Sequence, residues 1–244
     1  MRNALVVGGA NGIGLAIASE LAGRPDVEKV IIVDKALIDE RYVNSKFECH
    51  QFDLTSEDYS LFDRFKNVDT LMITAGMGRL ALFKDVTEEH IIRSFQVNTL
   101  SVIRIIKHFY DKLERQDDFY CGVMVSISGF MSSPFFAVYG ATKAALKVFI
   151  ESVNVELEKA GSTNRILNVS PGSIKGTSFY AGETDLYVLK NLTLEIIGNL
   201  EAKNDLYIPQ YDSIFKEVLE RYHNDFRAEG SHSYDYKLNS GRIK

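Results

Sequence analysis

The sequence is poor in several residue types that would point to particular classes of protein. It has no tryptophan, two cysteines and four prolines in 244 residues. Two cysteines are too few for a disulfide framework, so we expect Cys49 and Cys121 to be reduced core residues of a cytoplasmic protein. The sequence also contains no metal-binding motif and no low-complexity segment. These absences leave an ordinary globular protein as the expectation.

Positive charge and long apolar runs are also lacking. The chain has 28 Lys and Arg against 33 Asp and Glu, a net charge of -5. This balance gives no electrostatic reason to expect binding to nucleic acid or to an anionic membrane. No apolar stretch approaches the ~20 residues that cross a bilayer, and the short apolar opening, Asn3 to Gly8, is not a signal peptide. We therefore expect a cytoplasmic location.

What the chain does contain is an alternation of apolar runs and helical periodicity. Hydrophobic residues make up 45% of the chain and charged residues 25%, as in soluble globular domains. The alternation predicts βαβ units in one doubly wound α/β domain, a parallel sheet covered by helices on both faces. The ligand crevice of such a sheet lies at the carboxyl ends of its strands. Strands are expected at 4–8, 29–34, 46–51, 69–74, 121–128 and 165–170, and helices at 12–22, 57–66, 87–115 and 138–160.

A glycine-rich turn follows the first apolar run. The residues Gly8 to Gly14 read GGANGIG and lead into a helical pattern. Strand, glycine turn and helix in this order can hold a pyrophosphate, because the backbone approaches closely and the helix start offers N–H groups. The second apolar run ends in Asp34, twenty positions after Gly14. A carboxylate there accepts hydrogen bonds from ribose hydroxyls and repels a 2′-phosphate, which favours NAD over NADP. The neighbouring Lys35 could soften this preference.

Tyr139 and Lys143 lie four residues apart in AVYGATKAAL. The i, i+4 spacing places both side chains on one face of a helix. A free phenol has a pKa of about 10, and an adjacent positive charge lowers it. A tyrosine tuned in this way can exchange a proton with an alcohol or ketone oxygen.

The glycine loop VVGGANGIG and the Y-x-x-x-K motif together resemble the short-chain dehydrogenase/reductase family, over about the first three quarters of the chain. The resemblance implies an NAD-dependent oxidoreductase that interconverts a secondary alcohol and a ketone by hydride transfer, with no metal. Two alternatives stay open: an NADP-dependent reductase, and a non-catalytic dinucleotide-binding sensor on the same fold. The substrate cannot be read from the sequence.

The resemblance also implies roles for particular residues. Tyr139 is the general acid/base, Lys143 its partner, and Asn98 the asparagine of a proton relay. The catalytic serine is predicted at Ser128, which is nearest the strand end, although counting back from Tyr139 without a gap gives Ser126.

The remaining matches concern the cofactor. Asp53 is expected to contact the adenine, or equally to cap a helix beginning near Ser56, and Ala75-Gly76 matches a motif whose asparagines are replaced here by Ile73 and Thr74. The complete expected cofactor site is Gly8, Asn11, Gly12, Ile13, Gly14, Asp34, Asp53, Leu54, Ala75, Gly76, Tyr139, Lys143, Pro171, Gly172, Ile174 and Thr177.

The last part of the chain is less easily interpreted. The family resemblance implies a substrate lid over 174–200, with Phe179, Tyr180 and Tyr187 among its aromatic residues. Alternatively, these aromatic residues pack against a partner subunit or against the domain itself. The segment from Tyr211 to His223 predicts an amphipathic helix. In the tail 226–244, YDYKL could add an edge strand, or the tail could cross to a partner subunit. The resemblance implies a homodimer or homotetramer formed through the helices at 87–115 and 138–160.

Overall fold

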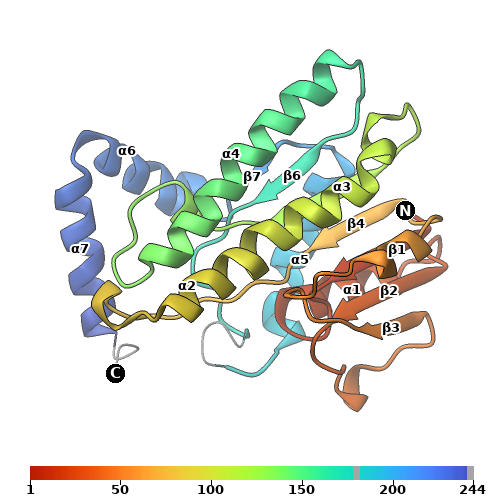
Figure 1. Cartoon of the computed structure of the whole chain (residues 1–244), viewed down its shortest axis with the longest axis horizontal. Coiled ribbons are helices and arrows are strands. Elements are labelled where there is room, and N and C mark those ends of the chain that lie inside the picture. The colour runs from red at the N-terminus through yellow and green to blue at the C-terminus, as the bar shows by residue number, and fades with distance from the viewer. Residues whose placement is uncertain (178–181, 241–244) are drawn as a thin grey trace.

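Seven parallel strands form a single sheet at the centre of the molecule (Figure 1). In this computed structural model, residues 1–177 and 182–240 are described. The strand order β3-β2-β1-β4-β5-β6-β7 reverses between β1 and β4, as in a doubly wound sheet, and confirms the predicted fold class. The strands are β1 (Asn3–Val7), β2 (Lys29–Asp34), β3 (Phe47–Gln51), β4 (Thr70–Ile73), β5 (Tyr120–Met124), β6 (Ile166–Val169) and β7 (Leu206–Tyr207).

Helices cover both faces of the sheet, and each face has its own apolar core. One core joins the sheet to α3 and α4 and the other joins it to α1 and α5. In Figure 1 the strands point toward the side where α6 and α7 lie, so these two helices stand at the carboxyl edge of the sheet. The helices are α1 (Gly12–Ala22), α2 (Glu88–Phe95), α3 (Ser101–Glu114), α4 (Ala137–Lys159), α5 (Leu186–Glu201), α6 (Lys216–Asn224) and α7 (Phe226–Asn239).

Two of the predicted helices differ in the structure. The segment expected to be helical over 57–66 contains only a 3₁₀ turn, Ser60–Arg64. Its buried aromatic residues Tyr59, Phe62 and Phe65 recur every third position, and three residues per turn is the period of a 3₁₀ helix. The helix expected over 87–115 is interrupted by a π-helical turn, Gln96–Leu100, between α2 and α3.

The chain after β6 differs most from expectation. The second half of the predicted lid, from Leu186 onward, is helix α5, whose residues Ile196, Ile197 and Leu200 are buried in the core beside α1. A lid over 174–200 is therefore too long, since an apolar helix face that packs on the sheet cannot also cover a substrate. Phe179 and Tyr180 lie outside the described residues.

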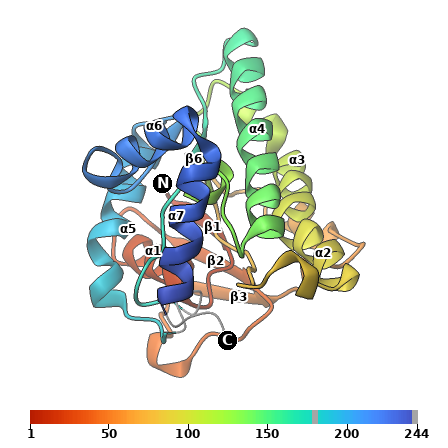
Figure 2. The same cartoon turned by 90° about the vertical axis from the view of Figure 1, so that its left-hand side faces the viewer.

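The amphipathic helix expected from Tyr211 is present as a π-helical turn, Tyr211–Phe215, followed by α6. The interpretation of YDYKL as an edge strand is wrong: it belongs to α7, and the edge strand is β7. The Asp225 carboxylate accepts hydrogen bonds from the N–H groups of Arg227 and Ala228 and so caps α7. Figure 2 shows α7 in front of the carboxyl edge of the sheet.

The two cysteines have different surroundings. Cys121 lies on the central strand β5 and is buried, which raises the pKa of its thiol to about 12. Cys49 lies on the edge strand β3 and is exposed, so the prediction that it is a core residue is wrong. An edge strand has a neighbour on one side only, and its outward residues therefore meet water.

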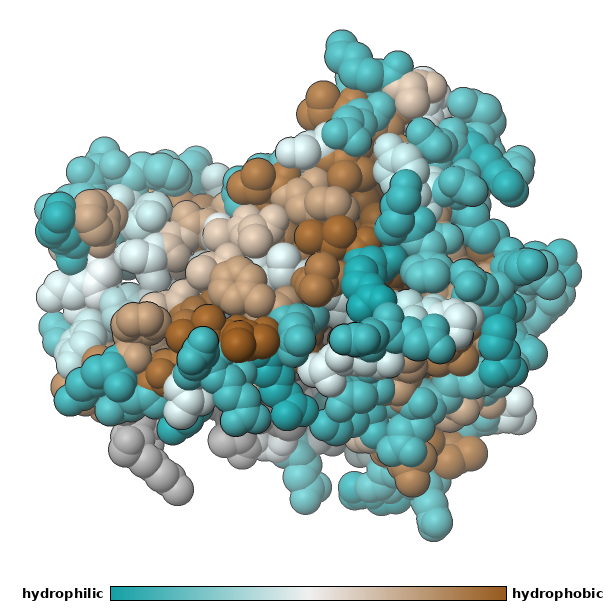
Figure 3. All heavy atoms as spheres, viewed as in Figure 1, coloured by the Kyte–Doolittle hydropathy of each residue, from teal (hydrophilic) through white to brown (hydrophobic). Residues whose placement is uncertain are grey.

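The outer surface of α2, α3 and α4 carries apolar side chains that meet solvent. Figure 3 shows hydrophobic residues gathered over this part of the molecule. They include Ile92, Phe95, Leu100, Val148 and Val155. None of the helices in the described ranges combines the length and the apolar character needed to cross a membrane.

Candidate active site

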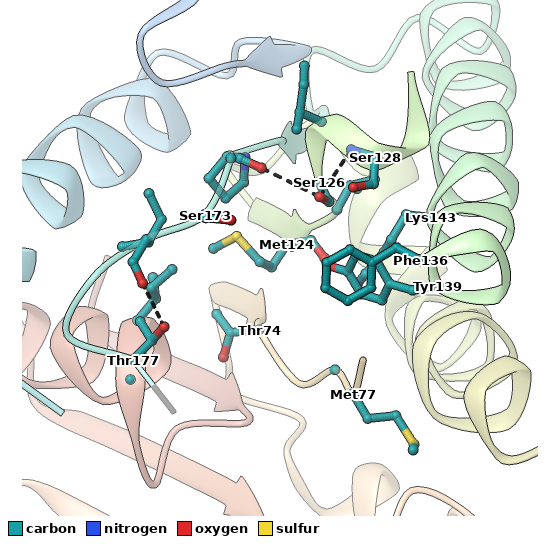
Figure 4. Close-up of a pocket in the computed structure, with 18 of the residues that line it drawn as sticks. Thr74, Met77, Met124, Ser126, Ser128, Phe136, Tyr139, Lys143, Ser173 and Thr177 are labelled. Atoms are coloured by element: carbon teal, nitrogen blue, oxygen red, sulfur yellow. Dashed lines mark hydrogen bonds between the residues drawn. The ribbon is translucent and has the colours of Figure 1, made fainter. Parts of the chain in front are cut away.

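A cavity of about 790 Å³ opens at the carboxyl ends of β1, β4, β5 and β6. Its walls come from the segments that directly follow these strands, together with α4 and the C-terminal helices. This is the place expected from the reversal of strand order. Figure 4 shows side chains from these separate elements facing the same space.

The glycine loop forms one end of the cavity, and two of its glycines are required by close contacts. Gly8 has a φ of +85°, and a Cβ atom added there would overlap the backbone of Ala75. A Cβ on Gly14 would overlap the carbonyl oxygen of Gly8. Helix α1 can therefore begin directly against β1. The side chain of Asn11 at its N-cap makes no capping bond, and the loop fits a bound pyrophosphate.

Asp34 lies beside this loop at the end of β2. Its carboxylate accepts hydrogen bonds from the N–H groups of Ala10 and Ala36, each at 2.9 Å. The neighbouring Lys35 forms an ion pair with Asp53 at 3.0 Å. Asp34 is thus held on the cavity wall. Lys35, the cation that could weaken the preference for NAD, is paired with Asp53.

Asp53 performs a structural role through Thr55. Its Oδ1 accepts from the Thr55 N–H at 2.9 Å and from the Thr55 hydroxyl at 2.8 Å. These hydrogen bonds, with that of Lys35, lower the pKa of Asp53 to about 2. The expected helix near Ser56 is not formed, so Asp53 closes a turn. Because Asp53 and Leu54 also line the cavity, the adenine contact stays a prediction.

Asn98 lies in the π-helical turn and is fully buried. Its Oδ1 accepts from the Met77 N–H, and its Nδ2 donates to the Met77 carbonyl, both at 2.8 Å. Nδ2 also donates to the Thr142 hydroxyl at 3.1 Å. The side chain therefore fastens the loop after β4 to α4. Its part in a proton relay stays a prediction.

Tyr139 and Lys143 lie one turn apart on α4, as their spacing predicts (Figure 4). The side chain of Ser126, which follows β5, has a small lowering effect on the pKa of the phenol. The Lys143 ammonium donates to the Met124 carbonyl at 2.8 Å and lies 5.7 Å from the centroid of the Tyr139 ring. The end of β5 is thus joined to Lys143.

Burial dominates the proton affinity of both groups. It raises the pKa of Tyr139 to about 12, against the smaller opposing effect of the Ser126 hydrogen bond. It lowers the pKa of Lys143, which is 2% exposed, to about 7. Burial thus opposes the charged form of both groups, and the lowering of the Tyr139 pKa by Lys143 stays a prediction.

The two serines after β5 have different partners. Ser126 accepts from the Ser128 N–H at 3.1 Å and donates to the Pro171 carbonyl at 3.5 Å. The Ser128 hydroxyl instead donates to Ser133 at 3.5 Å. Both line the cavity, but it is Ser126 whose side chain affects the pKa of the Tyr139 phenol. The 3₁₀ turn that starts at Ile127 carries Ser128 away, an effect that spacing alone does not reveal.

The segment after β6 runs along the glycine loop. Pro171, Gly172, Ile174 and Thr177 all line the cavity, as expected of cofactor residues. The Thr177 hydroxyl donates to the Ile174 carbonyl at 2.9 Å. Further on, the Thr184 hydroxyl accepts the N–H of Gly12 at 2.8 Å.

A family model described as short chain dehydrogenase matches residues 2–185. The chain belongs to the short-chain dehydrogenase/reductase family. A relative from Sinorhizobium fredii, described as an uncharacterized short-chain type dehydrogenase/reductase, is 31% identical over 210 residues, covering 84% of this chain and 77% of that protein.

Solved structures of short-chain dehydrogenases have the same fold. One from Burkholderia phymatum in complex with NAD is similar with a TM-score of 0.77 at 15% identity, covering 93% of this chain and 95% of that one. An alcohol dehydrogenase from Thermococcus sibiricus complexed with 5-hydroxy-NADP gives a TM-score of 0.70 at 20% identity, covering 85% and 95%. The shared fold thus accompanies either cofactor.

One part of this short-chain dehydrogenase was missed by sequence reasoning. Helices α6 and α7 contribute a wall of the cavity, although the family match ends before them. The apolar face of the segment 211–223 could have indicated this contribution, because such a face must pack against another part of the protein. The cavity residues that they and the preceding turn supply are Gln210, Ile214, Phe215, Val218, Arg221, Glu229, His232, Ser233, Tyr236 and Lys237.

Proposed function

We propose that this short-chain dehydrogenase is an NAD-dependent enzyme that interconverts a secondary alcohol and a ketone. The observation that supports this most is that Tyr139, Lys143 and Ser126 line one cavity together with the glycine loop and Asp34. The Tyr139 phenol and the Ser126 hydroxyl thus line the same cavity as the residues expected to hold the cofactor. This arrangement suits a substrate oxygen that gains or loses a proton during hydride transfer.

The roles of the side chains follow from their positions. The nicotinamide cofactor supplies or accepts the hydride. Tyr139 gives the proton to the carbonyl oxygen in reduction and takes it back in oxidation. Ser126 orients that oxygen, and Lys143, held by Met124, sets the electrostatic surroundings of the phenol. Asn98 keeps the loop after β4 in place through Met77.

The choice of NAD rests on Asp34 and Lys35. Asp34 places a carboxylate on the wall at the adenosine end, and Lys35 pairs with Asp53 instead of standing ready for a 2′-phosphate. Because both partners of this ion pair are largely exposed, the pair itself is weak. The discrimination is therefore assigned to Asp34.

Thermal unfolding with NADH, with NADPH and without cofactor tests this proposal. A ligand at about 100 times its Kd adds about 2.7 kcal/mol, which raises the Tm of a chain of this size by about 5–10 °C. We expect this shift with NADH. Asp34→Ala should lower NADH affinity and raise NADPH affinity, by about tenfold in their ratio. The exposed Asp26, which does not line the cavity, provides the matched control Asp26→Ala. Stabilisation by NADPH alone would reverse the assignment.

Turnover separates an enzyme from a cofactor sensor. With a ketone substrate, Tyr139→Phe should lower kcat by about 10²–10⁴-fold, the usual contribution of general acid–base catalysis. NADH should still stabilise this variant. Full activity in Tyr139→Phe would contradict the mechanism, and binding of NADH without turnover of any alcohol or ketone by the native protein would favour a sensor.

We also propose that the protein forms a homodimer or homotetramer through the helical segments 87–115 and 138–160, which contain α2, the π-helical turn, α3 and α4. The exposed Leu100, Val148 and Val155 give this face an apolar character that a second copy would cover. Light scattering should give the mass of a dimer or tetramer for the native chain, and Val148→Glu should reduce it. A monomeric mass for the native protein would contradict this assembly.

A further inference from the structure

The charges along the cavity are divided between its two ends. This inference rests on the proposed function, since it concerns the substrate of the same site. The cofactor end holds the carboxylates Asp34 and Asp53 with one cation, Lys35. The other end, walled by α2, α4, α6 and α7, is lined by basic side chains from all four helices and by one carboxylate. These side chains are Arg93 of α2, Lys143 of α4, Arg221 of α6, His232 and Lys237 of α7, and the carboxylate is Glu229.

The single carboxylate at this end has its charge balanced. Glu229 is 8% exposed, and its Oε2 lies 2.7 Å from Nε of Arg221. His232 lies 3.8 Å from the other oxygen of Glu229. The charges of Glu229 and Arg221 therefore offset each other, and the basic character of this end comes mainly from Arg93 and Lys237.

Among these cations, Arg93 is the side chain best suited to bind an anionic ligand. It lines the cavity from the last turn of α2 and is partly buried. Its guanidinium makes no hydrogen bond or ion pair with another residue in 1–177 or 182–240. A guanidinium presents donors in a planar fork that matches a carboxylate or a phosphate. In a protein of net charge -5, a basic chamber is also a local exception that would draw in anions.

Helix α7 is fixed over this chamber by contacts with the loop that follows Ser128. Lys237 donates to the Ser133 hydroxyl at 2.7 Å and to the Pro134 carbonyl at 2.9 Å. The rings of Phe135 and Tyr234 lie 4.6 Å apart, centroid to centroid. The C-terminal wall is thus built into the site, and its position relative to Tyr139 is defined.

We propose that the substrate carries an anionic group, a carboxylate or a phosphate, in addition to its alcohol or ketone, and that Arg93 binds that group. The walls of the same cavity also include the apolar side chains Met131, Phe136, Phe215 and Val218. They suit an apolar stem that joins the reacting carbon to the anion. Arg93 is a specificity-determining residue in this account, and Tyr139 acts on the other end of the same molecule.

Matched pairs of ketones test the proposal. Levulinate is compared with methyl levulinate, and dihydroxyacetone phosphate with dihydroxyacetone, as substrates for reduction by NADH or NADPH. We expect kcat/KM at least about tenfold higher for the anionic member of one pair, and a preference that falls as salt is added. A preference within the levulinate pair would indicate a carboxylate, and a preference within the dihydroxyacetone pair would indicate a phosphate. Arg93→Gln should bring the two members within about threefold, and Arg93→Lys should restore part of the difference.

The control is Arg64→Gln, because Arg64 is exposed and does not line the cavity. This variant should keep the native preference for the anion. Neutral ketones used as well as their anionic partners, or an anion preference that survives Arg93→Gln, would overturn the proposal.

Binding separates this proposal from the proposed function. The same four compounds are added to the protein with NADH during thermal unfolding. If no ketone is reduced, the proposed function fails, but stabilisation by an anion that depends on Arg93 would still support the anion site. If no anion stabilises the protein more than its neutral partner does, the anion site fails even where turnover is observed.

Discussion

Ser126 and Ser128 are two residues apart in the sequence, yet they have different roles in the structure. The Ser126 side chain affects the pKa of the Tyr139 phenol, whereas the Ser128 hydroxyl donates to Ser133. Because the 3₁₀ turn between them begins at Ile127, the side chains no longer alternate as they would in a strand. We therefore propose Ser126, the alternative to Ser128, for the substrate-orienting role.

This assignment predicts different kinetic effects for two matched variants. Ser126→Ala should lower kcat by about 10²-fold, because it removes a hydrogen bond to the reacting oxygen. Ser128→Ala should change kcat by less than about fivefold, since its hydroxyl bond to Ser133 is long and neutral. Steady-state kinetics with one ketone compare them, and NADH titration confirms that both bind cofactor. A larger loss in Ser128→Ala than in Ser126→Ala would return the role to Ser128.

The residues of the site differ in how far the sequence could predict them. Tyr139 and Lys143 belong to one helix, so their i, i+4 spacing determines which way they face. Asp34 follows from the distance between the glycine loop and the next strand end. The partner of Tyr139 depends on a turn from another element, and burial of Lys143 depends on the whole fold. Neither the partner of Tyr139 nor the burial of Lys143 can be predicted from a local sequence pattern.

At the scale of elements, apolar runs predicted the central strands because a buried parallel strand is apolar on both faces. The same reasoning left two possibilities for the segment of α5, a lid or packing against the domain, since both use apolar and aromatic residues. It also did not predict α7, where YDYKL alternates like a strand. Contacts with Ser133 and Pro134, distant in sequence, hold this segment in place as a helix.

A contact between the segment before α5 and the glycine loop bears directly on cofactor binding. The Thr184 hydroxyl accepts the N–H of Gly12 in the glycine loop, and the Tyr42 hydroxyl donates to the Thr184 carbonyl at 3.2 Å. The segment before α5 thus uses a donor of the kind that a pyrophosphate would take. Cofactor binding must then exchange one hydrogen bond for another.

We predict that Thr184→Val strengthens NADH binding by about threefold to tenfold. Valine keeps the branched shape but leaves the Gly12 N–H available, and a net hydrogen bond contributes about 0.5–1.5 kcal/mol. Titration followed by NADH fluorescence measures the Kd. Tyr42→Phe, which loosens the same segment, should change it in the same direction. Weaker binding in Thr184→Val would mean that the hydroxyl contacts the cofactor in the complex.

At the scale of the whole molecule, burial of Lys143 lowers the free energy of unfolding by an amount that depends on pH. Its pKa is lowered from 10.5 to about 7 by burial. Between these values the unfolded chain binds more protons than the folded one, so stability rises with pH across this window. Below pH 7 the lysine is protonated in both states, and the destabilisation is largest there, at most about 5 kcal/mol.

Lys143→Met should therefore stabilise the protein in the absence of cofactor while it abolishes catalysis. The gain in Tm should be largest at pH 6 and should shrink toward zero as pH approaches 10, because native Lys143 is then neutral in the fold at little cost. Thermal unfolding at several pH values gives the difference between the two proteins. Lys190, which is exposed on α5, supplies the control Lys190→Met, for which no such dependence is expected. A gain that is constant with pH would show that packing, and not the charge of Lys143, separates native protein and variant. A loss of stability at pH 6 would show that the hydrogen bond to Met124 outweighs the cost of burying the ammonium.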